Sequence, residues 1–142
     1  MVKDFDKSLF NLKGGTVRVS AANYYPEPGA ASVHLLFADG SNLRAAYWRV
    51  TQDGKASMSS FDHWQQYGLP ERIDVIAELQ AQLQDKTVID ARADGETGDL
   101  LFQFGGNVKF QVFNFSSYEV WEIHFANGSG EYSPSARPAL LI

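Results

Sequence analysis

Apolar and polar residues alternate along most of the chain with the period of two that is typical of half-buried β-strands. The alternation is clear in 16–22, where Val17 and Val19 fall on one face and Arg18 and Ser20 on the other. It continues, with turn residues between the runs, over the ranges 33–38, 43–50, 87–93, 99–104, 107–113 and 118–125. Turns containing glycine separate several of these runs, so the pattern predicts a mainly β, antiparallel fold.

One stretch shows a helical period instead. Ile73, Ile76, Leu79 and Leu83 recur every three to four residues, and polar side chains occupy most of the positions between them. The proline at the start of this stretch suits the first position of a helix. We therefore expect one amphipathic helix over about 70–84. Its polar side is not basic, which favours docking of the apolar stripe on the sheet over docking on a membrane.

The segments before and after this helix resemble each other. Residues 34–44 align without gaps on 99–109, and the tripeptide 48–50 matches 121–123, each beginning with tryptophan. Each half is expected to be a four-stranded antiparallel meander, and the two similar meanders to pack as a sandwich or as one strongly bent sheet. The sequence thus predicts a single α+β domain over 1–142 with a pseudo-repeat, 14–54 and 85–128, and the helix between its halves.

Residue content excludes several kinds of chemistry. The chain has no cysteine, which excludes disulfides and zinc sites built on thiolates. The three histidines, His34, His63 and His124, show neither His-x-His nor His-Glu-x-x-His spacing, so we expect no metal and no cofactor. No apolar run resembles a signal peptide or approaches the roughly 20 residues that span a bilayer. The expected location is the cytoplasm, with no membrane partner.

Charge is distributed unevenly. Of the net charge of −5, residues 1–84 carry nine acids and eight bases, whereas 85–131 carry eight acids and three bases. Nucleic-acid affinity comes largely from Lys and Arg, so an acidic half argues against a nucleic-acid partner. It favours a basic protein partner, whose approach a negative field accelerates.

Some of these acids are predicted to share a surface. On the last long strand Trp121 and Ile123 point to one side, which places Glu122 on the other. If the meander brings this strand near the turn two strands earlier, the acids form a patch that captures Arg and Lys. A dispersed, solvated set of charges is the alternative. The predicted partner-binding residues are Asp94, Glu96, Asp99, Glu119 and Glu122.

The pair Asp62-His63 is the one adjacent acid and histidine. A general base needs an acid that orients its imidazole and a nucleophile within hydrogen-bonding reach. Serines stand nearby in the sequence, but no nucleophile motif accompanies them. We therefore expect no catalytic residues and no enzyme, with a small hydrolase that uses Asp62 and His63 as the less favoured reading.

The second half resembles a known class of proteins. The stretches 98–104 (GDLLFQF) and 112–123 (VFNFSSYEVWEI), with the tripeptide 48–50 (WRV), resemble small bacterial immunity-type and uncharacterised proteins of polymorphic toxin systems. The resemblance implies an immunity protein that neutralises a cognate toxin by direct stoichiometric binding. Because no signal peptide is expected, that toxin would act in the cytoplasm, as a nuclease does. The alternative is a non-catalytic binding or scaffold domain that could pair with a second copy through an exposed sheet edge.

Overall fold

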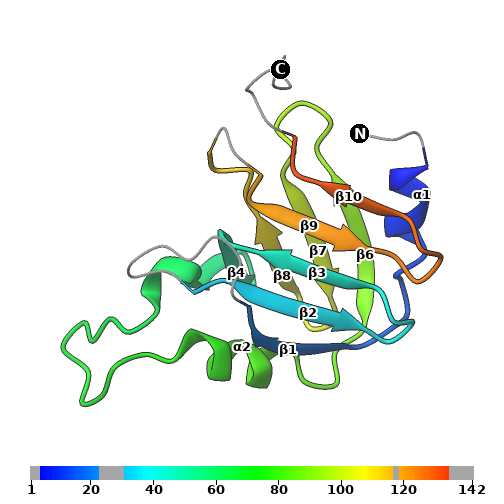
Figure 1. Ribbon diagram of the computed structural model, residues 1–142. Helices are drawn as coiled ribbons and strands as arrows, with labels where there is room; N and C mark the ends of the chain where they lie inside the picture. Colours follow the sequence, from blue (N-terminus) through cyan, green and yellow to red (C-terminus); the bar gives the residue numbers. More distant parts are fainter. Residues whose placement is uncertain (1–3, 23–30, 117–118, 135–142) are drawn as a thin grey trace.

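The computed structural model describes residues 4–22, 31–116 and 119–134 of the 142-residue chain (Figure 1). Within these ranges the chain forms ten strands, two α-helices and one 3-10 helix. In chain order the elements are α1 (Phe5–Phe10), β1 (Val17–Ala21), β2 (Val33–Phe37), β3 (Asn42–Ala45), β4 (Trp48–Gln52), β5 (Lys55–Ser59), η1 (Ser60–Asp62), α2 (Val75–Leu83), β6 (Val88–Ala93), β7 (Leu100–Phe104), β8 (Val108–Val112), β9 (Trp121–His124) and β10 (Gly130–Tyr132).

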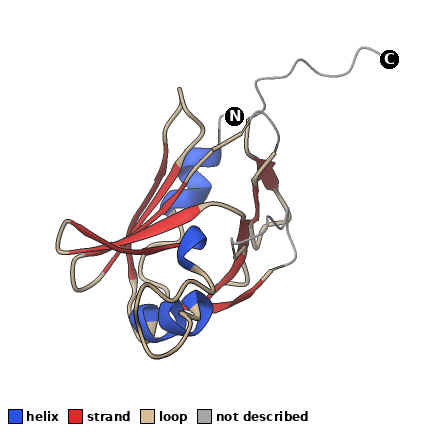
Figure 2. Cartoon of the chain, turned by 90° about the vertical axis from the view of Figure 1, so that its left-hand side faces the viewer, coloured by secondary structure: helices blue, strands red, loops and turns tan. Residues whose placement is uncertain are grey.

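The described strands form two five-stranded antiparallel sheets that pack together. The first sheet has the order β1-β2-β3-β9-β10, and the second has the order β5-β4-β8-β7-β6. Figure 2 shows these two layers of strands with the helices between them. Inward positions alternate with outward ones, as in β8, where Val108, Phe110 and Val112 are buried and the residues between them are not. The predicted mainly β sandwich, with one substantial helix between its halves, is confirmed.

The two halves of the chain exchange strands between the sheets. Strands β1 to β3 of the first half pair with β9 and β10 of the second half, while β6 to β8 pair with β4 and β5. The chain changes sheet at Ala46, whose N–H donates to Val120 O at 3.0 Å, and at Tyr47, whose carbonyl accepts from Phe113 N at 2.9 Å. Each half therefore differs from the expected four-stranded meander. Its first three strands share one sheet, but its fourth strand, β4 or β9, belongs to the other sheet. The exchange pairs every interior strand on both sides and lets each sheet cover the apolar face of the other.

The hairpins of the two halves correspond with a shift relative to the gapless alignment. Leu35 pairs with Leu43 in β2–β3, and Phe102 pairs with Phe110 in β7–β8, each at the same distance from its turn. In the structure, Leu35 is therefore equivalent to Phe102. The gapless alignment of 34–44 on 99–109 instead matched Leu35 to Leu100. The shift is two residues, so it preserves which side chains face the core. For this reason the alternation alone did not reveal it.

Helix α2 begins later than the sequence predicted. It spans Val75–Leu83 rather than 70–84, because the Asp74 carboxylate accepts hydrogen bonds from Ile76 N and Ala77 N and caps the helix there. The residues from Pro70 to Ile73 belong to the preceding loop. The helix connects both sheets, since Gln80 Nε2 donates to Val19 O in β1 at 2.9 Å and Gln82 Oε1 accepts from Ser57 Oγ in β5 at 3.2 Å.

Helix α1 and strands β5 and β10 were not anticipated from the sequence. Helix α1 has only six residues, too few for a visible period, but Phe5 and Leu9 are buried and Phe5 stacks on Trp121 at 5.9 Å between ring centroids. Strand β5 lies at a sheet edge and buries only Met58, so its alternation is weak. The predicted strand 118–125 is observed as β9, and positions 117 and 118 lie outside the described residues.

Candidate functional site

Three of the five predicted acids lie on the turn between β6 and β7. The Asp94 carboxylate accepts hydrogen bonds from Glu96 N at 2.8 Å and from Thr97 N at 3.1 Å, which closes the turn. The backbone N–H groups of Thr97 and Glu96 hold the pKa of Asp94 below its ordinary value, so this carboxylate is charged at neutral pH. Glu96 is exposed at the tip of the same turn.

Asp99 is fixed on the other side of this turn. Its Oδ1 accepts a hydrogen bond from Asn114 N at 2.7 Å. The Asn114 side chain in turn donates to Thr97 O at 3.0 Å and to Pro134 O at 2.8 Å, which ties the turn to the segments after β8 and β10. Hydrogen bonds from the protein itself therefore hold Asp94 and Asp99 in place.

Glu122 is not part of this group. Glu122 lies on the outer face of the first sheet, where its carboxylate is 3.7 Å from the guanidinium of Arg44 and 3.4 Å from the ring of His124. Its side chain is only 12% exposed. Glu119 is exposed just before β9. The structure thus brings together Asp94, Glu96 and Asp99 and places Glu122 in a separate ion pair.

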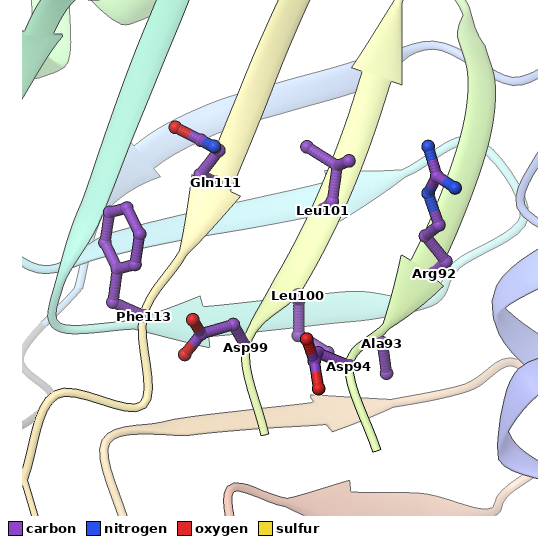
Figure 3. Close-up of a pocket in the computed structure, with 8 residues that line it drawn as sticks. All are labelled: Arg92, Ala93, Asp94, Asp99, Leu100, Leu101, Gln111 and Phe113. Atoms are coloured by element: carbon purple, nitrogen blue, oxygen red, sulfur yellow. The ribbon is translucent and has the colours of Figure 1, made fainter. Parts of the chain in front are cut away.

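A groove of about 340 Å³ runs beside the acidic turn across the outer face of the second sheet (Figure 3). Leu101 and Phe113 supply apolar surface, Asp94 and Asp99 lie at the end of the strands, and Arg92 stands on the neighbouring strand β6. The complete lining is Arg92, Ala93, Asp94, Asp99, Leu100, Leu101, Gln111 and Phe113. Such a groove offers apolar contact to a side chain and two carboxylates to a positive charge at its end.

Two arginines border the groove and already have contacts. Arg49 Nε donates to Gln111 Oε1 at 2.7 Å, and its guanidinium lies 5.2 Å from the ring centre of Phe113. Arg92 Nε is 3.4 Å from Asp90 Oδ2, with 64% of its side chain exposed. The groove therefore has a basic side along the strands and an acidic side at their ends. A positively charged side chain that enters it should place its charge at the acidic end.

Asp62 and His63 take part in loop structure. Asp62 Oδ2 accepts from Ser59 N at 2.8 Å, and Asp62 Oδ1 accepts from the Tyr67 hydroxyl at 2.8 Å. His63 Nδ1 accepts from Val75 N at 3.4 Å, at the start of α2. In this arrangement both side chains fix the loop between η1 and α2, and the hydrogen bonds of the carboxylate go to Ser59 and Tyr67.

Two sets of surface residues were not predicted from the sequence, one in the groove and one outside it. Leu101 and Gln111 lie at outward positions of β7 and β8, and Phe113 directly follows β8. The turn chemistry of the acids alone does not point to any of the three. The other set consists of the exposed aromatic residues Phe61, Trp64 and Tyr67. They lie in a segment whose secondary structure was not predicted from the sequence. These exposed residues could have been anticipated, because the segment has many aromatic residues but neither a helical nor a strand period that would bury them.

Comparisons with models of protein families, with curated proteins and with solved structures find no match to this chain. Within the described ranges, no helix has the length and apolar character needed to cross a bilayer. The same part of the chain has no cluster of three His, Asp or Glu side chains arranged to hold a metal ion.

Proposed function

We propose that this chain is a cytoplasmic immunity protein, which neutralises a cognate toxin by binding it stoichiometrically. The observation that carries the proposal is the pair of carboxylates, Asp94 and Asp99, fixed by backbone N–H groups beside an apolar groove. Because these acceptors are in place before a partner arrives, binding a Lys or Arg side chain costs little conformational entropy. This is the arrangement expected of a surface that captures a basic protein.

Two further features support a toxin as that partner. The acidic turn falls in the stretch 98–104 or directly before it, and this stretch resembles immunity-type proteins. The excess of acids in 85–131 favours a basic partner, and a nuclease is basic where it binds phosphates. An acidic blocker can occupy the place of those phosphates and so prevent substrate from entering.

The electrostatic field gives the proposal a kinetic consequence. Acids at the rim of an interface mainly change the rate of association, and their effect weakens as salt increases. Association of this protein with its toxin should therefore be fast and salt-sensitive. Replacing the turn acids by amides should slow it by about tenfold at low salt.

The test compares two variants of equal charge. In one, Asp94→Asn, Glu96→Gln and Asp99→Asn remove the charges of the turn but retain the oxygen that each aspartate uses as an acceptor. The control removes three acids elsewhere, on α1 and in two other turns, by Asp6→Asn, Asp39→Asn and Asp53→Asn. Association with the toxin encoded by the neighbouring gene, in an inactive form, is measured at low and high salt.

Slow, salt-insensitive association of the turn variant only, together with loss of protection in cells that express the active toxin, supports the proposal. Equal slowing of both variants would mean that net charge alone matters and that the groove is not the contact. If the wild-type protein neither binds this toxin nor protects cells from it, the immunity function itself is wrong. The chain would then be a binding or scaffold domain for another partner.

A further inference from the structure

The loop between η1 and α2 exposes large aromatic side chains. Trp64 is 54% exposed and Tyr67 is 67% exposed, and the neighbouring Leu69 is 48% exposed. In Figure 1 this green segment extends away from the two sheets at the left of the molecule. Tryptophan is rarely so exposed in a folded chain, and Trp and Tyr are the residues that most often dominate protein interfaces.

The backbone of this loop is held in an unfavourable conformation. Trp64 has a φ of 65° and Tyr67 a φ of 47°, both in the left-handed region that bulky residues avoid. A bulky residue keeps this conformation only where surrounding contacts impose it. Here the contacts are a backbone pair that closes the loop, from Trp64 N to Ile73 O and from Ile73 N to Gln65 O, both at 2.8 Å.

Both aromatic rings are oriented by side chains at the base of the loop. The ring of His63 stacks on Trp64 with 5.0 Å between centroids and an interplanar angle of 6°, and His63 is itself anchored by Val75 N. The hydroxyl of Tyr67 donates to Asp62 at 2.8 Å. The rings are therefore exposed but not free to rotate, which lowers the entropy that a partner must remove when it binds them.

A hollow of about 460 Å³ lies between this loop and α2. Leu69, Pro70, Ile73 and Ala77 make its apolar wall. Its charged lining consists of three acids and one base, Glu71, Asp74, Glu78 and Arg72. A long aliphatic side chain that ends in a positive charge, which is to say Lys or Arg, matches both the wall and the excess of acids.

We propose that the 61–78 surface is the anchor for a basic protein, which receives Trp64 and Tyr67 in an apolar pocket and places a Lys or Arg in the hollow. The inference rests on the proposed function, since that protein is taken to be the toxin. A second copy of this chain fits less well, because the chain carries a net charge of −5 and the hollow is acidic in both copies. The acidic turn then attracts the toxin, and the aromatic loop holds it.

The test uses Trp64 as its own reporter. Trp48 and Trp121, the other tryptophans of the sequence, are buried, so acrylamide quenches mainly the fluorescence of Trp64. An inactive form of the toxin from the neighbouring gene should remove this quenching and shift the emission to shorter wavelength. Trp64→Ala should weaken the complex by about 30-fold or more, as expected for a dominant interface residue. The control is Phe10→Ala, which removes an equally exposed aromatic residue on α1 and should change affinity less than threefold.

The outcomes separate the two proposals. If the wild-type protein binds the toxin but Trp64 stays open to acrylamide and Trp64→Ala binds normally, only the anchor is wrong. If the wild-type protein does not bind the toxin, the proposed function fails and the anchor fails with it. If Trp64 becomes protected when the free protein is concentrated, and Trp64→Ala stays monomeric, the occupant is a second copy and the inference is overturned.

Discussion

Trp48 and Trp121 make the same hydrogen bond in the two halves of the chain. The indole N–H of Trp48 donates to Ala31 O at 2.8 Å, two residues before β2. That of Trp121 donates to Gly98 O at 2.8 Å, two residues before β7. Both indoles are buried, so each ties a strand of one sheet to the start of a hairpin in the other.

Replacing either tryptophan by alanine should destabilise the protein to a similar degree. Truncation of a large buried aromatic residue costs about 3–5 kcal/mol, through lost burial and the cavity that remains. Trp48→Phe and Trp121→Phe retain most of the ring volume, so their smaller cost mainly reflects the lost hydrogen bond, about 1 kcal/mol. Urea denaturation followed by circular dichroism measures both. A change below 1 kcal/mol for one alanine variant, beside a large one for the other, would contradict the equivalence.

Two buried serines should stabilise the protein by accepting hydrogen bonds from backbone N–H groups. Ser60 Oγ accepts from Trp48 N at 3.2 Å, and Ser133 Oγ accepts from Val120 N at 2.7 Å. Because alanine leaves these buried N–H groups without an acceptor, each substitution should cost about 1–3 kcal/mol. Ser57→Ala is the matched control, since Ser57 is exposed and bonds only to a side chain, and it should be nearly neutral. Equal effects at all three positions in thermal denaturation would argue against this account.

Gly98 should not tolerate a side chain, whereas Gly95 in the same turn should. Gly98 has a φ of +79°, and an added Cβ would lie 2.7 Å from Pro134 and 2.9 Å from the Asn114 side chain. Gly95 has no atom within 4 Å of such a Cβ. Gly98→Ala is expected to cost on the order of 1–3 kcal/mol from the backbone alone, and Gly95→Ala less than about 0.5 kcal/mol. Denaturation midpoints of the two variants test the difference, and similar midpoints would refute it.

Tyr67 should titrate later than an ordinary tyrosine. Its hydrogen bond to the Asp62 carboxylate, with smaller contributions from desolvation and from the charge of Asp62, raises the pKa of Tyr67 above its ordinary value. Because the folded pKa is the higher one, this bond stabilises the loop fully below the unfolded value and is lost as the pH rises through the folded value. An ultraviolet titration of tyrosinate should show a late component that Tyr67→Phe abolishes and Asp62→Asn shifts to lower pH. A titration curve that Asp62→Asn leaves unchanged would contradict the bond.

Part of the candidate acidic site could be predicted from the sequence and part could not. Asp94, Glu96 and Asp99 are close together in the sequence, and one turn holds them, so their grouping was predictable from local chemistry. The position of Glu122 was not, because it depends on the pairing of β9 with β3, which sets Glu122 beside Arg44. That pairing joins the two halves of the chain, and the pattern of one strand does not reveal its neighbour.

The sequence by itself determined most of the strands, their buried faces and the presence of one amphipathic helix, because alternation, glycine turns and amphipathic spacing act within a few residues of each other. It did not determine α1, β5, β10 or the start of α2 at its Asp74 cap. Only the tertiary structure decided which strands share a sheet and which side chains come together on the surface. Phe113 reaches the groove beside Asp99 because β8 pairs with β7, and Trp64 is exposed because contacts with Ile73 and His63 hold its loop away from the core. These arrangements follow from the free energy of packing and pairing segments that are distant in the chain, which no local pattern encodes.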